Sequence, residues 1–153
     1  MTVQKDFITR FLLAVFAFMV VDGVIWTLGF FATRSLYIDA RYYSVWTHDM
    51  LSFIEGGRWS LTSLAGVEIW TALVGVIFVG GYVWLNRRLP GTPLQRGASY
   101  GLLAFLIGGL YQLLGMAMVV DLPAPIIASW IALSALVLVL QGAATGLIIK
   151  KGL

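Results

Sequence analysis

The chain has 153 residues, of which 60% are hydrophobic and 11% are charged, a composition typical of a protein that lies within a lipid bilayer. Its formal net charge is +3, but the charges fall between long apolar segments and form no basic face, so nucleic-acid binding is not expected. The chain has no cysteine and one histidine. Iron–sulfur clusters, covalently attached haem and a bis-histidine haem within one chain are therefore excluded, and no other cofactor is indicated.

Four apolar segments, at about residues 8–32, 64–85, 99–120 and 124–149, are long enough to cross the hydrocarbon core as helices. We predict an all-α integral membrane protein with one transmembrane domain over residues 1–153, its four helices forming an antiparallel bundle. The first segment follows basic residues as a secretory signal would. Its apolar run is about twice the usual length, so we expect it to remain as an anchor.

The distribution of Lys and Arg predicts the orientation, because basic residues near the ends of a span resist translocation. The basic residues expected on one side are Lys5, Arg10, Arg87, Arg88, Arg96, Lys150 and Lys151. Those expected on the other side are Arg34, Arg41 and Arg58. Both termini are therefore predicted to be cytoplasmic, in a membrane such as the cytoplasmic membrane of a prokaryote.

The outer loop between the first two spans contains a segment with helical periodicity, at about residues 41–55. One of its faces is apolar, with Tyr43, Trp46, Met50 and Phe53. The opposite face carries Arg41, Ser44, His48, Ser52 and Glu55. This pattern predicts a short interfacial amphipathic helix on the outer membrane surface.

Asp22 is the main candidate for an intramembrane polar site. An ionised carboxylate near the middle of a bilayer costs at least about 2.5 to 3.5 kcal/mol, so another group must compensate it. Depth along the spans places Gln112 at a similar level, with Tyr111 beside it and Trp26 one turn from Asp22. Two interpretations stay open: a protonated Asp22 that joins helices by a hydrogen bond, or a site for a lipophilic or cationic ligand.

Glycines indicate where helices pack closely. Gly101, Gly108 and Gly115 recur every seven residues in the third span, and this spacing predicts a smooth face against another helix. In the fourth span, Gly142 and Gly146 form a GxxxG motif, which indicates close contact within the chain or between chains.

A polar patch is expected at the outer face. Its residues are His48, Asp49, Glu55 and Glu68. Glu68 could instead only extend its carboxylate to the lipid headgroups. The spacing typical of metal ligands is absent, so we expect no metal at this patch.

Motifs of hydrolases, metalloproteases and nucleotide-binding loops are absent from the sequence, which favours a non-enzymatic role. In outline the chain resembles the small multidrug transporters, which have four helices and one acid in the first span. Its long outer loop departs from their form, and no motif matches, so the sequence assigns no family.

Three functions follow in order of preference. The first is a structural or accessory subunit that packs against larger membrane partners, lipids or cofactors. The second is a small proton-coupled transporter or a membrane protein that binds a lipophilic ligand through Asp22. The third is a lipid-modifying membrane enzyme. Expected partners are the lipid bilayer and either other membrane subunits or further copies of the chain.

Overall fold

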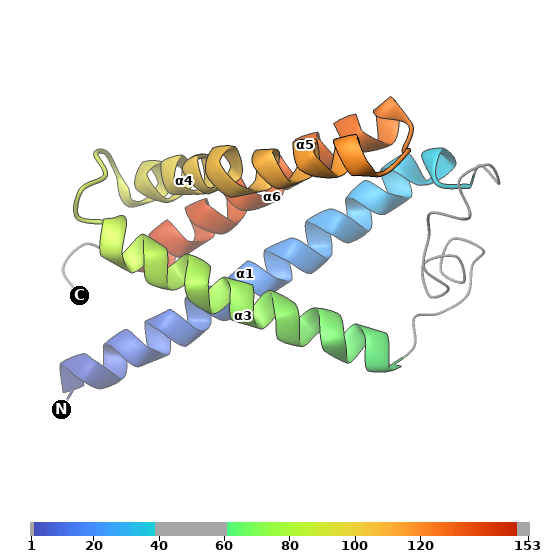
Figure 1. Ribbon diagram of the computed structural model, residues 1–153. Helices are drawn as coiled ribbons and strands as arrows, with labels where there is room; N and C mark the ends of the chain where they lie inside the picture. Colours follow the sequence, from blue (N-terminus) through green and yellow to red (C-terminus); the bar gives the residue numbers. More distant parts are fainter. Residues whose placement is uncertain (1, 39–60, 150–153) are drawn as a thin grey trace.

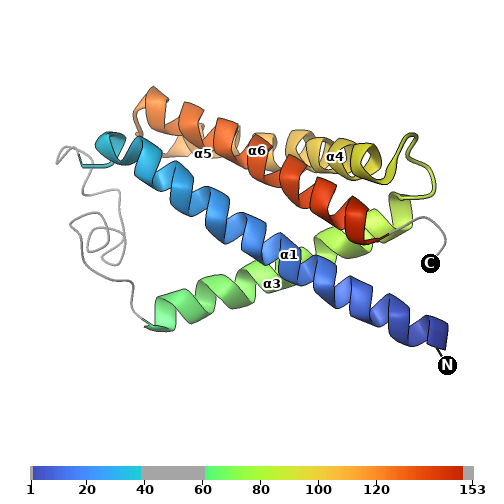
Figure 2. The same cartoon turned by 180° about the vertical axis from the view of Figure 1, so that it is seen from behind.

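The computed structural model describes residues 2–38 and 61–149, and these residues form helices joined by short connections, with no strand among them (Figures 1 and 2). The elements are α1 (Thr2–Thr33), the 3-10 helix η1 (Arg34–Leu36), α3 (Leu61–Leu85), α4 (Pro93–Ala104), the π-helix η3 (Phe105–Gly109), α5 (Leu110–Val119) and α6 (Ala124–Ile148). The predicted interfacial helix at 41–55 lies outside the described residues.

Four helical spans within the described residues are long and apolar enough to cross a membrane, as the sequence predicted: Gln4–Leu36, Leu64–Leu85, Pro93–Val119 and Ala124–Ile148. The third begins at Pro93 and not near residue 99, because a capping box starts the helix there. The Thr92 hydroxyl accepts from the Gln95 amide at 3.3 Å, and the Gln95 side chain accepts from the Thr92 amide at 2.9 Å. Pro93, in the first turn, needs no amide partner.

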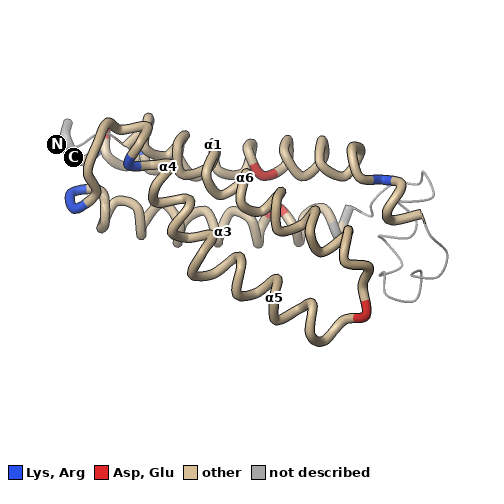
Figure 3. Tube along the Cα trace, turned by 90° about the horizontal axis from the view of Figure 1, so that it is seen from above, with Lys and Arg blue, Asp and Glu red and all other residues tan. Residues whose placement is uncertain are grey.

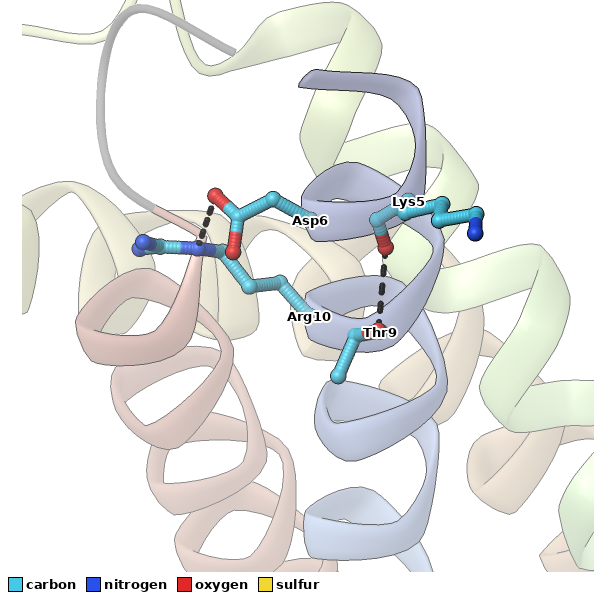
Figure 4. A network of polar contacts seen from close by, with 4 residues as sticks. All are labelled: Lys5, Asp6, Thr9 and Arg10. Atoms are coloured by element: carbon cyan, nitrogen blue, oxygen red, sulfur yellow. Dashed lines mark hydrogen bonds and ion pairs between the residues drawn. The ribbon is translucent and has the colours of Figure 1, made fainter. Parts of the chain in front are cut away.

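Most of the charged residues lie near the two ends of the helices (Figure 3). At the start of α1, Arg10 donates to Asp6 at 3.0 Å, and Thr9 donates to the Lys5 carbonyl at 2.9 Å (Figure 4). This ion pair is exposed, so it contributes little to stability. Near the middle of α1 the sequence places Asp22, and α3 carries Glu68.

Helices α4 and α6 pack against each other most closely, and α1 crosses both α6 and α3 (Figures 1 and 2). The close approach depends on glycine. A Cβ atom at Gly97 would overlap the Gly142 carbonyl, one at Gly101 would overlap the Leu138 carbonyl, and one at Gly146 would overlap the Pro93 carbonyl. The GxxxG motif of the fourth span therefore packs within the chain against a second one, Gly97–Gly101, which the sequence analysis missed.

The predicted glycine face of the third span is divided. Gly101 lies against α6, but Gly108 and Gly115 have no atom within 4 Å of the position that a Cβ would occupy. The π-helix η3 lies between Gly101 and Gly115, and its wider turn changes the helical register on which the seven-residue spacing depends. Beyond η3, α5 diverges from α6.

An aromatic core fills the end of the molecule at which α3 ends and α4 begins. Phe78 packs between Phe18 and Tyr100, with ring centroids 5.0 and 4.8 Å away, and Tyr82 lies 5.5 Å from Tyr100. The Tyr100 hydroxyl donates to the Phe78 carbonyl at 2.9 Å, which ties α4 to α3. Arg96, expected at the membrane surface, is 4% exposed and lies beside Tyr82 in this core.

Candidate functional site

A cavity of about 740 Å³ lies between the helices and extends from Phe18, at the edge of the aromatic core, toward Tyr37 and Trp130. Side chains from α1, α3, α5 and α6 line it. It exists because α5 diverges from α6 after η3, while α3 packs mainly against α1. Because α3 and α5 lie apart from α6 over this part of their length, the space that their side chains would fill in a closely packed bundle stays open.

The walls of the cavity are mostly apolar and rich in aromatic rings: Phe18, Trp26, Phe30, Tyr37, Trp70 and Trp130. At the end of the cavity nearest η1, the Trp130 indole N–H donates to the Tyr37 hydroxyl, and the Phe30 ring lies 5.4 Å from the Tyr37 ring. These contacts join Tyr37, which follows η1, to α6 and α1.

Asp22 lines the cavity from α1, and the hydrogen-bond partner that the structure gives it is Gln141 of α6. The Gln141 side-chain amide donates to Asp22 Oδ1 at 3.2 Å and to the Phe18 carbonyl at 3.1 Å. Gln141 is 1% exposed. Two hydrogen bonds from one buried side chain thus join α6 to α1 and hold one oxygen of the Asp22 carboxylate in place.

The sequence analysis expected Gln112 as the partner of Asp22. Gln112 does line the same cavity, from α5, and so does Trp26. Tyr111 does not belong to the cavity lining and is 79% exposed on the outside of α5. Gln112 and its other neighbour, Leu113, face the cavity, and Tyr111 lies on the side of α5 that is turned away from it.

Glu68 also lines the cavity, from α3. The sequence analysis placed it in an outer-face patch with His48, Asp49 and Glu55, which lie outside the described residues. The structure shows that Glu68, an exposed residue, lines the same cavity as Asp22, and it does not test the predicted patch. Within residues 2–38 and 61–149, no group of three or more acidic, histidine or cysteine side chains could hold a metal ion.

The polar groups of the cavity are unbalanced in charge. Asp22 and Glu68 are acidic, and none of the described lining residues is Lys, Arg or His. The other polar lining residues are Thr27, Thr71, Gln112, Ser134 and Gln141. In the apolar part of a membrane, a bound cation or protons would offset the cost of ionised carboxylates at these positions.

Gln141 is the residue of this site that the sequence analysis missed. A signal was present: Gln141 is the one amide side chain in the fourth span and directly precedes the glycine motif at Gly142. A polar side chain beside a close helix contact is placed where a neighbouring helix can satisfy it.

No family model, curated protein or solved structure matches this chain.

Proposed function

We propose that this protein binds an amphiphilic ligand with a cationic head group inside the membrane, in the cavity between its helices. The observation that supports this function is a cavity of about 740 Å³ with aromatic walls and Asp22 in its lining. Pockets of about 300 to 1,000 Å³ suit ligands of drug-like size. The aromatic walls match the apolar part of such a ligand, and the carboxylate matches its charged part.

The energetics favour a cation over a neutral ligand. A bound cation offsets the cost of an ionised carboxylate in the apolar part of the membrane, and the faces of Trp26 and Trp70 add cation–π attraction. A proton can balance the same carboxylate when the cavity holds no cation. Exchange of the proton for the cation is the step that a proton-coupled transporter needs, so transport is the stronger form of this proposal.

Purification in mild detergent tests the function. We expect a non-protein amphiphile to accompany the wild-type protein in near-equal amount, and to be identifiable by mass spectrometry of an organic extract. Asp22→Asn should lose it, because the substitution removes the negative charge and keeps the side-chain shape. Equal recovery from both proteins would count against Asp22 as the anchor.

A structural or accessory subunit is the second candidate, and one observation favours it. Gly108 and Gly115 lie on the exposed part of the third span with open space beside them. Small residues on an outward face allow a helix of another subunit to approach closely. This function predicts that a membrane subunit copurifies in fixed ratio with the chain and is lost from Gly108→Leu.

A further inference from the structure

Asp22 keeps one carboxylate oxygen available for a ligand. Its Oδ1 accepts from the Gln141 amide at 3.2 Å, and the structure gives its Oδ2 no hydrogen-bond partner among the described residues. The buried side-chain polar atoms without a partner in that part of the chain are Arg96 Nε and Gln141 Oε1, and Oδ2 is not one of them. Oδ2 therefore keeps accessible surface, on a side chain that lines the cavity.

Glu68 is a second acid in the lining of the same cavity, on α3. Asp22 is half-buried and Glu68 is exposed, so a ligand in the cavity can reach both side chains. The two acids belong to no group of three or more potential metal ligands among the residues that the structure describes. An organic cation therefore suits them better than a metal ion.

The two acids lie on facing sides of α1 and α3, beyond the point where these helices are in contact. At that contact, a Cβ atom at Gly75 would lie 3.1 Å from the Phe18 ring. Asp22 follows Phe18 by about one turn and Glu68 precedes Gly75 by about two, so each lies on the face that makes the contact. These steps are about 6 and about 10 Å along helices that diverge toward η1 (Figures 1 and 2). The acids therefore offer two separate anchors.

A ligand with one positive charge balances only one of these acids. None of the described lining residues is Lys, Arg or His, so the lining offers the second carboxylate no cationic partner. Two ammonium groups on one ligand could each donate to a carboxylate, and such charge-assisted hydrogen bonds are the strong ones. A hydrocarbon chain between the two groups would lie against the aromatic walls.

We infer that the ligand of this cavity carries two cationic groups separated by an apolar chain, with one group on Asp22 and the other on Glu68. The inference depends on the proposed function, since it names the second charged group of the same ligand. Glu68 is then the residue that selects a ligand with two charges over a ligand with one. A single ammonium needs only Asp22, so it binds with or without the Glu68 carboxylate.

The test measures calorimetric binding to the full-length protein in phosphatidylcholine nanodiscs, with empty nanodiscs as the blank. The probes are octylammonium, octanol and a series of alkane-α,ω-diammonium ions of increasing length, because the separation of the two acids decides which chain reaches both. In the wild type, we expect the best diammonium ion to bind at least about tenfold more tightly than octylammonium, as one more charge-assisted hydrogen bond implies.

Two matched variants identify the residue that selects. Glu68→Gln removes the charge and keeps the side-chain shape. It should weaken binding of the best diammonium ion at least about tenfold, and binding of octylammonium about threefold or less. Asp121→Asn removes an exposed acid from the turn between α5 and α6, at the same end of the molecule but outside the cavity lining. It should keep both affinities within about threefold of the wild type.

The wild-type comparison decides the inference even where Glu68→Gln does not fold. Octylammonium that binds as tightly as every diammonium ion overturns the inference and leaves the binding function standing. A preference that survives in a folded Glu68→Gln protein, or that Asp121→Asn reduces equally, overturns the role of Glu68. Absence of saturable binding for every ammonium probe overturns the proposed function, and the inference with it. A preference that only Glu68→Gln removes supports both.

Discussion

The contact between Asp22 and Gln141 places a carboxylate and an amide at the junction of α1 and α6. On a surface exposed to water, a hydrogen bond between such a pair contributes little to the free energy of unfolding. Inside a membrane, interhelical hydrogen bonds contribute about 0.6 to 2 kcal/mol each, because unfolded helices in lipid also find partners. The pair therefore contributes modestly to stability, and the role proposed for the charge of Asp22 is in binding.

Replacement of Asp22 separates structure from binding. Asp22→Asn keeps an oxygen that can accept from Gln141, so we expect the free energy of unfolding to change by no more than about 1 kcal/mol. Affinity for octylammonium should decrease at least about tenfold, because the charge is gone. Thermal unfolding in detergent and calorimetry in nanodiscs measure the two effects. A variant that binds as the wild type does would remove Asp22 from the site.

Asp22 could be identified from the sequence, because an acid in an apolar span is costly wherever its partner lies. Its partner could not. Depth counting placed Gln112 beside it, but depth does not specify which face of a helix turns inward. That rotation is set by the contact of Gly97 and Gly101 with α6, which positions Gln141 against α1.

At the scale of elements, the pair α4 and α6 is the most tightly packed part of the molecule. The backbones touch at glycines, so dispersion contacts and weak backbone interactions replace the side-chain interdigitation of soluble proteins. Since the approach is limited by backbone atoms that cannot move aside, added side-chain volume must separate the helices.

Two alanine substitutions in one span test this packing. Gly101→Ala places a methyl group against the Leu138 carbonyl and should destabilise the protein by about 1 to 3 kcal/mol. Gly108→Ala meets open space and should stay within about 0.5 kcal/mol of the wild type or stabilise it, because alanine favours a helix. Unfolding monitored by circular dichroism compares them. Equal effects would mean that Gly101 does not lie at a close contact.

The π-helix η3 links the packed helix α4 to the diverging helix α5, and Gly109 at its end lines the cavity. A π-turn contains one residue more than the α-helical turn it replaces, so it changes the direction of every later side chain. Such segments often lie at functional sites. The sequence offered no sign of η3, because its composition, Phe-Leu-Ile-Gly-Gly, also suits an ordinary transmembrane helix.

Deletion of one residue should remove the π-turn. Ile107 is 70% exposed, so its loss costs few contacts within the chain. The remaining residues can close as an α-helix, which rotates α5 by about 100° and turns Gln112 and Met116 away from the cavity. We expect weaker octylammonium binding, by about fivefold or more, with less loss of thermal stability than Gly101→Ala causes. Unchanged affinity would show that η3 does not shape the site.

At the scale of the whole molecule, the spans could be predicted from hydropathy and length, but their arrangement could not. Apolar side chains that face lipid and those that face another helix have the same composition, because lipid is as apolar as leucine. The spread of α3 and α5 therefore left no trace in the sequence. The cavity results from this spread, so hydropathy could not indicate that Asp22 and Glu68 line the same space.

The ends of the helices divide the molecule into two sides. The start of α1, the connection from α3 to α4 and the end of α6 lie on one side, and η1 and the turn from α5 to α6 lie on the other (Figure 1). The connection from α3 to α4 carries Arg87 and Arg88, and Arg88 stacks over the Trp84 ring at 5.1 Å. Arg96 is buried and so does not belong to that surface. The sequence still assigns more of the remaining Lys and Arg residues to this side than to the other.

We therefore expect the side with Arg87 and Arg88 to face the cytoplasm, because basic residues resist translocation. The chain has no cysteine, so a single introduced cysteine reports its own side. Pro90→Cys lies in the connection from α3 to α4, and Ser35→Cys lies in η1 at the opposite end, and both positions are exposed. In intact cells, a membrane-impermeant maleimide should label Ser35→Cys and leave Pro90→Cys unlabelled until the membrane is opened.

The reverse pattern would invert the orientation and place the cavity, which lies in the half of the molecule near η1, toward the cytoplasm. Labelling of both positions in intact cells would mean that they lie on the same side, so that α3, which lies between them in the chain, does not cross the membrane.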